Sequence, residues 1–336
     1  MDPVAALKRI ALLLERAGEH TQKVRAFRRA ASIVANLPTS EIAERTKAGT
    51  LTALPGIGDT TATVIAESVA GGEPEYLRRL TEAGTKPVAG GAELRAALRG
   101  DCHTHSDWSD GGSPIEEMAR AAIDIGHEWI ALTDHSPRLR VANGLSADRL
   151  REQLAVVAEL NVELAPFLIL TGIEVDILTD GALDQTEDLL STLDVVVASA
   201  HSSLRMPSAE MTERMLTAVA NPHVDVLGHC TGRLVTGKGR PESTFDADAV
   251  FAACAEYGVA VEINSRPERL DPPRALLRRA VELGCAFAID SDAHAPGQLD
   301  WQPYGCERAQ ECGIGPDRVI NTRTSEELLA GIAARR

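Results

Sequence analysis

Aromatic side chains are scarce in this chain of 336 residues. Three Trp, three Tyr and five Phe make up only 3 % of the sequence. Proteins that bind single-stranded nucleic acid stack successive bases on such rings, so this composition argues against an extended stacking channel. With 44 % hydrophobic and 25 % charged residues, the chain is otherwise ordinary for a globular protein and long enough for one large domain and one small one.

The sequence also lacks the features of membrane and secreted proteins. No hydrophobic run approaches the roughly 20 residues that a transmembrane helix needs. The N-terminus, Met1-Asp2-Pro3, has no basic segment followed by an apolar stretch. Six cysteines show neither a C-x-x-C pair nor the spacing of a disulfide framework, so we expect reduced thiols. These absences predict a cytoplasmic protein without membrane contact.

Charge is distributed unevenly along the chain. The formal net charge is −15, yet residues 1–100 carry 14 Lys and Arg against 11 Asp and Glu. The acidic remainder argues against broad coating of nucleic acid. Bound divalent cations would offset part of this negative charge.

Histidine is concentrated at the ends of apolar runs. The stretch Asp101–Gly111 contains His103 and His105, which alternate and therefore project from one face of an extended strand. Six of the nine histidines lie at such ends: His103, His105, His135, His201, His229 and His294. A single buried histidine is more often a hydrogen-bonded core residue. Six at corresponding positions indicate a metal site, because imidazole is a common ligand of divalent metals.

From Gly100 onward, predicted strands alternate with predicted helices. The strands end near positions 105, 135, 174, 201, 229, 264 and 292. The helical candidates are Pro114–Ile125, Ala147–Leu160, Ala209–Ala220, Asp246–Tyr257 and Arg274–Leu283. Seven β–α repeats with polar residues at their carboxyl ends fit a parallel α/β barrel, whose active sites occupy that rim. An open doubly wound sheet would concentrate the site at one switch point instead, so we predict a TIM-like barrel.

The first part of the chain is predicted to be helical. Residues 4–37 contain two apolar helical stripes, and the exposed side of the second is basic, with Arg25 and Arg28 among its residues. An ordinary solvated charged face is the alternative explanation. The turn Pro55–Thr60 then opens another helix, and the free backbone N–H groups at such a turn suit a phosphate.

The phrases LLERAGEHTQKVRAFRRAASIV and LPGIGDTTATVIAE resemble the helix-hairpin-helix region at the N-terminus of bacterial family X DNA polymerases. The resemblance implies sequence-nonspecific binding to a DNA backbone. The candidate DNA contacts are Gly56, Ile57, Gly58, Thr60, Arg25 and Arg28. Lyase-active relatives carry a Schiff-base lysine where this chain has Val64, so we do not expect strand-end lyase chemistry. The palm and fingers of those polymerases have no room between Leu80 and Asp101, so we do not expect polymerase activity.

Residues 100–300 resemble the polymerase-and-histidinol-phosphatase (PHP) family, in particular the module attached to bacterial family X polymerases. The matching motifs, in order, are DCHTHSDWSDG, ALTDHS, TGIEVDILTDGALD, ASAHSS, DVLGHCTGR, EINSRPERLDPP and IDSDAH. The resemblance implies a distorted seven-stranded barrel that holds three divalent metals. We therefore expect an all-α helix-hairpin-helix domain at 1–82, a linker at 83–99 and a hydrolase barrel at 100–336.

The same resemblance implies nine metal ligands. The first metal would be held by His103, His105, Glu174 and Asp292, which are also the expected catalytic residues. Glu174 would bridge to a second metal held by His201 and His229, and a third would be held by Asp110, His135 and His294. Histidine and carboxylate ligands without cysteine suit Zn²⁺, Mn²⁺ or Fe²⁺, and the sequence does not choose among them.

Such a site points to hydrolysis of a phosphate ester. Metals about 3.5–4 Å apart can clamp the attacking and leaving oxygens, and a metal-activated water supplies hydroxide without a protein nucleophile. Four basic residues that follow strand ends are candidates for gripping the substrate: Arg138, Arg233, Lys238 and Arg266. Each is equally well explained as an ordinary surface charge. Trp108, in the first loop, either stacks on the substrate or packs over the rim.

Three functions stay open at this point. The leading hypothesis is a metal-dependent DNA end-processing enzyme, a 3′-to-5′ exonuclease or a 3′-phosphatase, to which the helix-hairpin-helix region delivers a strand end. The first alternative is a small-molecule phosphomonoesterase of the histidinol-phosphatase type. The second is a catalytically silent DNA-bound scaffold, against which nine intact ligand positions argue. The natural substrate, the resident metal and the oligomeric state are not predicted.

Overall fold

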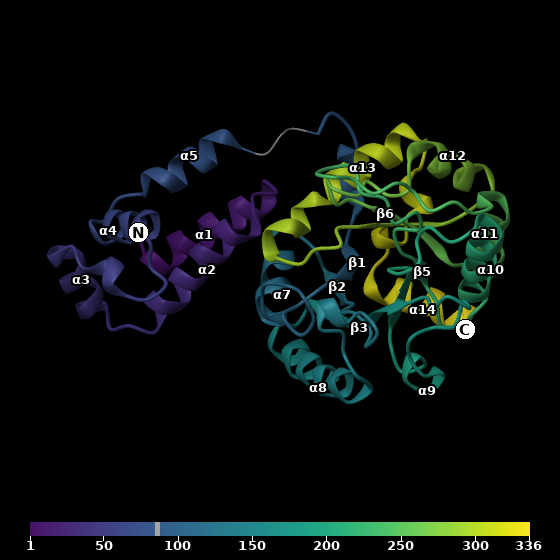
Figure 1. Cartoon of the computed structure of the whole chain (residues 1–336), viewed down its shortest axis with the longest axis horizontal. Helices are drawn as coiled ribbons and strands as arrows, with labels where there is room; N and C mark the ends of the chain where they lie inside the picture. The colour runs from purple at the N-terminus through teal and green to yellow at the C-terminus, as the bar shows by residue number, and fades with distance from the viewer. Residues whose placement is uncertain (85–87) are drawn as a thin grey trace. The chain divides into compact units, whose positions relative to one another are not determined.

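The computed structural model describes residues 1–84 and 88–336. The chain divides into two compact units, Met1–Pro87 and Val88–Arg336 (Figure 1). In the described residues, all six cysteines are buried free thiols, as expected. No helix among these residues is both long enough and apolar enough to cross a membrane.

The first unit is entirely helical. Its elements are α1 (Pro3–Arg16), α2 (Thr21–Ala35), α3 (Thr39–Ala48), the 3₁₀ turn η1 (Leu51–Ala53), α4 (Asp59–Val69) and α5 (Glu75–Ala83). The apolar stripe of α1, including Leu7 and Leu14, packs against Phe27 of α2 and Val64 of α4 in one buried cluster. Helix α1 begins at Pro3 because Asp2 accepts a hydrogen bond from the N–H of Ala5 at 2.7 Å. The side chain of Val64 is thus completely buried in the core of this unit.

The second unit is the predicted barrel, with seven parallel strands in sequence order. They are β1 (Gly100–Thr104), β2 (Trp129–Leu132), β3 (Leu168–Asp176), β4 (Val195–Ser199), β5 (Val226–Leu227), β6 (Ala260–Asn264) and β7 (Phe287–Asp290). A parallel bridge between Thr104 and Ala293 joins the first strand to the segment after the last. The barrel fold expected from the sequence is therefore confirmed.

Helices surround the strands of this unit (Figure 1). They are α6 (Ala92–Ala97), α7 (Ile115–Asp124), α8 (Ala147–Glu163), α9 (Glu187–Leu190), α10 (Ser208–Val219), α11 (Ala247–Tyr257), α12 (Arg274–Glu282), α13 (Gln302–Glu311) and α14 (Ser325–Arg335). Short 3₁₀ turns complete it: η2 (Arg140–Ala142), η3 (Pro296–Trp301), η4 (Pro316–Arg318) and η5 (Ile320–Thr322). The five helices predicted for the barrel are present, with ends within three residues of those expected.

Strand residues alternate between two buried layers. Val195 and Val197 face a cluster inside the barrel, whereas Val196 packs in the cluster beneath the helices. Because both faces are covered, the strands read as continuous apolar runs rather than as alternating ones. Leu328 of α14 belongs to the inner cluster, and Arg336 pairs with the buried Asp225 at 2.7 Å. Helix α14 thereby covers the amino-terminal end of the strands and leaves the carboxyl-terminal rim for a site.

The segment that precedes the barrel belongs to the second unit. The N–H of Ala89 donates to Oε1 of Glu307 at 2.9 Å, and the N–H of Gly91 donates to Gln310. A side chain at Gly91 would place its Cβ 2.5 Å from backbone atoms of α13, so the close approach requires glycine. Residues 88–99, expected as part of a linker, therefore pack on α13.

Candidate metal centre

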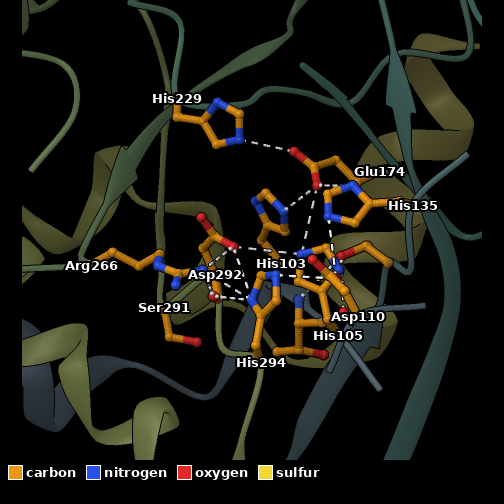
Figure 2. A network of polar contacts seen from close by, with 12 residues as sticks. His103, His105, Asp110, His135, Glu174, His229, Arg266, Ser291, Asp292 and His294 are labelled. Carbon is orange, nitrogen blue, oxygen red and sulfur yellow. Dashed lines mark hydrogen bonds and ion pairs between the residues drawn. The ribbon is translucent and has the colours of Figure 1, made fainter. Parts of the chain in front are cut away.

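Imidazoles from β1 and from the segments that follow β2, β4 and β5 converge on one buried carboxylate, Glu174 of β3; Figure 2 shows His103, His135 and His229 near it. Its Oε2 lies 3.3 Å from Nε2 of His103 and 2.8 Å from Nδ1 of His135. Its Oε1 lies 2.9 Å from Nε2 of His229 and 3.2 Å from Nε2 of His201. Residues separated by more than a hundred positions thus share one carboxylate at the rim.

A second carboxylate, Asp110, gathers the neighbouring imidazoles. Its Oδ1 lies 3.3 Å from Nε2 of His294 and 3.5 Å from Nε2 of His135. Nε2 of His105 lies between the two groups, 3.6 Å from Oε2 of Glu174 and 3.5 Å from Oδ1 of Asp292. All nine predicted ligand positions therefore belong to one continuous cluster.

Three overlapping sets offer ligand atoms within 4.8 Å of one another: His105, Asp110, His135 and His294; His103, His105 and Glu174; His135, Glu174 and His201. These sets differ from the predicted grouping in two ways. His105 joins the set expected around the third metal, and His135 joins the set expected around the second. His229 and Asp292 lie outside the three sets, although both contact members of them.

The donor set fits divalent metal ions. Several of its buried polar atoms have no hydrogen-bond partner among the described residues, including Nε2 of His103, both ring nitrogens of His105, Nε2 of His201 and Oε2 of Glu174. A buried polar atom left without a partner costs about 1–3 kcal/mol. Shared divalent cations would satisfy several of these atoms together, and imidazole and carboxylate are ligands that such cations accept.

Two further carboxylates orient the imidazoles. Oε1 of Glu262 lies 2.6 Å from Nδ1 of His103, and its other oxygen accepts the backbone N–H of His229. Oδ1 of Asp176 lies 3.3 Å from Nδ1 of His201 and accepts that residue's N–H at 3.1 Å. Partners of this kind select the ring orientation and the tautomer. Glu262 is not among the residues predicted from the sequence, although a carboxylate within the apolar strand β6 is a usable signal.

Asp292 is held in an unusual backbone conformation. Its φ of 52° is in the left-handed region, which is strained for a residue with a side chain. Asn264 donates to its Oδ2 at 3.1 Å, and Nε of Arg269 lies 3.2 Å from the same oxygen. Nη1 of Arg266 lies 3.3 Å from Oδ1, and Figure 2 shows its guanidinium beside Asp292 and His294. These contacts keep the carboxylate directed into the cluster.

The cluster shifts the pKa values of its members in opposite directions. Burial raises the pKa of Glu174, but the imidazoles of His103 and His135 outweigh burial and hold it well below its usual value. Burial lowers the pKa of His103, yet Glu174 and Glu262 bring it well above the usual value. Burial, with the neighbouring His294 and His135, holds the pKa of His105 well below its usual value. Glu174 therefore stays ionised at neutral pH.

The cluster opens into a cavity of about 540 Å³. Its lining includes Asp110, His135, His201, Asp292 and His294 from the cluster. Three arginines also line it, Arg240, Arg266 and Arg269, together with the apolar residues Leu139, Val141, Ala142 and Leu234. The volume lies in the range of small-molecule sites, about 300–1,000 Å³.

Of the four predicted substrate-binding residues, Arg266 alone is among those that line this cavity. The guanidinium of Arg233 instead donates to the carbonyl of Arg269 at 3.0 Å and contacts Glu242 at 3.1 Å. Arg138 lines a separate surface pocket, and Lys238 lines neither that pocket nor the cavity. A residue that follows a strand end has its Cα near the rim, but its place in the sequence does not determine the direction of a long side chain in a loop. Arg240 and Arg269 were missed for the same reason.

The first loop is held by contacts within the barrel. Trp108 packs against the buried clusters of the barrel rather than lining the cavity, and its carbonyl accepts from Asn143 at 3.1 Å. Asp134 precedes the candidate ligand His135 in the sequence. Its carboxylate accepts from the N–H of Ser106 at 2.8 Å and from the Ser106 hydroxyl at 2.6 Å, which fixes the loop after β1.

The candidate DNA contacts of the first unit serve different roles. Gly56 has a φ of 100°, and a Cβ there would lie 2.7 Å from Cδ of Arg29. Ile57 is buried in the helical core, so its side chain is not free for a ligand. The N–H of Gly58 donates to Oγ1 of Thr61 at 3.0 Å, while Thr60 is exposed in the first turn of α4.

The two arginines of α2 also differ. Arg25 is exposed. Nε of Arg28 lies 2.6 Å from Oε1 of Glu15, a carboxylate whose side chain is only 2 % exposed. Arg28 therefore compensates a buried charge, and Arg25 is the better candidate for a phosphate contact.

The chain matches two described families. Residues 1–74 match the helix-hairpin-helix domain, and residues 101–266 match the PHP domain. A curated relative is the DNA polymerase/3′-5′ exonuclease PolX of Bacillus subtilis (strain 168), 40 % identical over 233 residues. The match covers 69 % of this chain and 40 % of PolX, so the chain spans less than half of that relative.

Shorter proteins match over most of their length. A probable phosphatase of Thermoanaerobacter sp. (strain X514) is 33 % identical over 233 residues, covering 66 % of this chain and 89 % of that protein. Among solved structures, the histidinol phosphate phosphatase of Lactococcus lactis, complexed with zinc, L-histidinol and phosphate, aligns with a TM-score of 0.48 and 18 % identity. That alignment covers 65 % of this chain and 95 % of the other. The motifs, the barrel and these sequence relatives establish that the chain belongs to the PHP family, with a helix-hairpin-helix domain preceding the PHP barrel.

Proposed function

We propose that this chain is a metal-dependent phosphoesterase that processes DNA ends, either as a 3′-to-5′ exonuclease or as a 3′-phosphatase. Its place in the PHP family makes it a hydrolase of phosphate esters. The observation that carries the proposal is the buried cluster around Glu174, which opens into a cavity lined by three arginines.

The ligand assignment is part of the proposal. His103, His105, Glu174 and Asp292 would hold one ion, Glu174 with His201 and His229 a second, and Asp110, His135 and His294 a third. Glu174 suits the bridging position because its two oxygens face different imidazoles. Bound divalent ions would supply electrophilic activation of the phosphoryl group and of the attacking water. Zn²⁺ and Mn²⁺ are the favoured ions, with Fe²⁺ also compatible with this donor set.

The chain's own residues bind and position the substrate. Arg266 contacts Asp292 and His294 on one side, at 3.3 and 3.0 Å, and lines the cavity. Its guanidinium has five N–H donors in a planar fork that suits phosphate oxygens. Arg240 and Arg269 add positive charge along the same cavity. A negatively charged phosphoester is thereby drawn toward the cluster.

DNA is the proposed substrate because of the first unit. Residues 1–74 match a helix-hairpin-helix domain, and a relative at 40 % identity is named a DNA polymerase/3′-5′ exonuclease. Within the first unit, exposed Arg25 and the backbone N–H groups of Asp59 and Thr60, in the first turn of α4, are the proposed contacts to the DNA backbone.

A small-molecule phosphomonoesterase is the second candidate. Relatives named probable phosphatases match over about nine tenths of their length, as the 89 % coverage of the Thermoanaerobacter protein illustrates. The barrel alone therefore accounts for most of such a protein. A silent scaffold is disfavoured, because all nine candidate ligands contact the cluster.

The test offers three substrates to the purified protein with Mn²⁺ or Zn²⁺: 3′-recessed DNA, a 3′-phosphorylated strand and histidinol phosphate. We expect release of nucleotides or of phosphate from the DNA substrates. Turnover of histidinol phosphate alone would overturn the DNA assignment in favour of the second candidate. The His103→Ala variant is the control, because activity that survives this change comes from a contaminant.

A further inference from the structure

The cavity above the metal centre has an apolar edge. Leu139, Val141, Ala142 and Leu234 line it and are here called the apolar collar. Val141 is 92 % exposed, more than any other large hydrophobic side chain in the described ranges 1–84 and 88–336. A single exposed valine needs no explanation. Here, however, it continues an apolar surface that borders a site for a charged group.

The first half of the collar is held rigidly. The segment that carries it closes on itself, because the N–H of Leu145 donates to the carbonyl of His135 at 2.7 Å. A Cβ at Gly144 would lie 1.8 Å from the carbonyl oxygen of Ser136, so only glycine permits the crossing. Asn143 has a φ of 55° and donates to the carbonyl of Trp108 at 3.1 Å. Val141 is therefore presented to solvent by a fixed backbone.

The second half of the collar comes from a hairpin. Leu234 and Arg240 exchange backbone hydrogen bonds of 2.9 Å in both directions, and the N–H of Val235 donates to the carbonyl of Glu268 at 2.7 Å. The hairpin thus brings one apolar and one cationic side chain to the same cavity. A surface fixed before the ligand arrives loses less entropy on binding.

The charges of the cavity limit what the collar can accept. Arg240, Arg266 and Arg269 repel a cationic ligand. Apart from the metal-ligand candidates, the carboxylate among the lining residues is Glu268, whose Oε2 lies 3.9 Å from Nε of Arg266. An organic amine therefore lacks an uncompensated carboxylate there. The cavity favours an anion whose organic part has an apolar face.

We propose that the apolar collar is the subsite for the organic part of the phosphoester, and that it takes the sugar and base of a terminal nucleotide. The proposal deepens the proposed function and rests on it. The cavity of about 540 Å³ is large enough for more than a phosphate group. Aliphatic side chains contact the faces of all four bases alike, so the subsite selects nucleotides without selecting sequence.

The test compares two phosphomonoesters, a deoxynucleoside 3′-monophosphate and glycerol 2-phosphate, by release of phosphate. In Val141→Ser and Leu139→Ser, we expect KM for the nucleotide to rise by about ten-fold. Loss of binding that is equal in ground and transition states leaves kcat unchanged. Both constants for glycerol 2-phosphate stay at the wild-type values. The matched control is Val162→Ser, because Val162 is 81 % exposed on α8 and does not line the cavity.

A binding measurement separates this proposal from the proposed function. Calorimetry compares a deoxynucleoside 5′-monophosphate with inorganic phosphate on the metal-loaded protein. We expect tighter binding of the nucleotide, and we expect Val141→Ser to remove that difference. If no phosphoester is turned over but this pattern holds, the proposed function fails and the collar stands. Identical effects on both ligands, no effect at all, or a lower KM for histidinol phosphate than for the nucleotide would overturn the collar.

Discussion

Oε1 of Glu262 lies 2.6 Å from Nδ1 of His103, and both side chains are completely buried. The other oxygen of Glu262 accepts the backbone N–H of His229. One carboxylate on β6 thus fixes two candidate ligands that come from β1 and from the end of β5. Because Glu262 does not line the cavity, it acts through these ligands rather than on the substrate.

We expect Glu262→Gln to lower metal affinity by about 10- to 100-fold, the range found when partners of metal ligands are removed. The glutamine has one acceptor oxygen, so it cannot serve the ring of His103 and the N–H of His229 together. Metal content after dialysis and titration calorimetry would measure the change. The control is Glu268→Gln, which removes a partly exposed carboxylate at the cavity edge. Equal metal affinity in the Glu262→Gln variant and the wild type would contradict the assigned role.

Chelation should abolish phosphoester hydrolysis, and added Mn²⁺ or Zn²⁺ should restore it. In Glu174→Gln we expect a rate at least about 100-fold lower that added metal does not restore, because this carboxylate borders four imidazoles. Phosphate release and bound metal per protein are the measurements. Full activity in the presence of chelator would show that the cluster is not a metal site.

Acid should destabilise the protein partly through His127, which is buried beside α7. Burial and the charge of Arg95 lower the pKa of His127 from 6.5 to about 3. The unfolded chain therefore binds this proton near its usual pKa, whereas the folded protein does not. The free energy of unfolding falls as the pH drops from about 6.5 toward 3, by about 1.4 kcal/mol per pH unit for this residue.

Urea unfolding of the metal-free protein at several pH values would measure this slope. In His127→Gln we expect the pH dependence between pH 6.5 and 4 to be shallower than in the wild type by that amount. The stability of both proteins should change little with pH above 7 on account of this residue. Parallel pH curves for the two proteins would contradict the shifted pKa.

The hairpin glycines of the first unit should respond differently to substitution. A Cβ at Gly58 meets nothing within 4 Å, so Gly58→Val adds bulk on the open side of the turn. We expect it to weaken DNA binding while leaving hydrolysis of a small chromogenic ester unchanged. Gly56→Val should unfold the first unit instead, because φ is 100° and the Cβ would lie within 2.8 Å of Arg29 and Ile33. DNA affinity and thermal unfolding distinguish the two variants. If Gly58→Val lost activity equally on DNA and on the chromogenic ester, the hairpin would only support the fold.

Arg28 should matter for stability rather than for DNA. Removing it takes from the buried carboxylate of Glu15 the two hydrogen bonds that Arg28 donates, and we expect Arg28→Ala to lower the stability of the first unit by about 2 kcal/mol. Arg25→Ala, at an exposed position of the same helix, should leave stability unchanged and reduce DNA affinity. Chemical denaturation and DNA titration of both variants would check this. A stable Arg28→Ala protein with weak DNA binding would restore the role first predicted for Arg28.

The barrel and the convergence of its histidines could be predicted because both depend on local patterns. Apolar runs that end at His135 or Glu174 mark the strand ends, and parallel strands bring those ends to one rim. The directions of long side chains could not be predicted in this way. Arg233 and Arg266 both follow strand ends, yet the first turns to backbone carbonyls and the second to the cavity. That choice depends on loop contacts distant in sequence.

Two helices and one residue that orients the candidate ligands were also not predicted from the sequence. Helix α3 has few buried side chains, so its apolar periodicity is weak, and α14 lies beyond the last strand of the repeat. Glu262 lies within the apolar strand β6 rather than after its end, so the pattern of polar residues at strand ends does not include it. Its role becomes visible only in the folded barrel, which places β6 beside β5 and brings Glu262 into contact with His103 of β1.

Because Gly144 packs closely against the backbone of Ser136, one loop determines both the position of a candidate metal ligand and the shape of the cavity edge. The eleven residues 135–145 that present Val141 begin at His135, a candidate metal ligand, and return to its carbonyl group. A substitution that opened this loop would displace an imidazole as well as the rim. Within this loop, side chains at positions 138–142 can therefore change while the ends of the loop keep the candidate ligand in place.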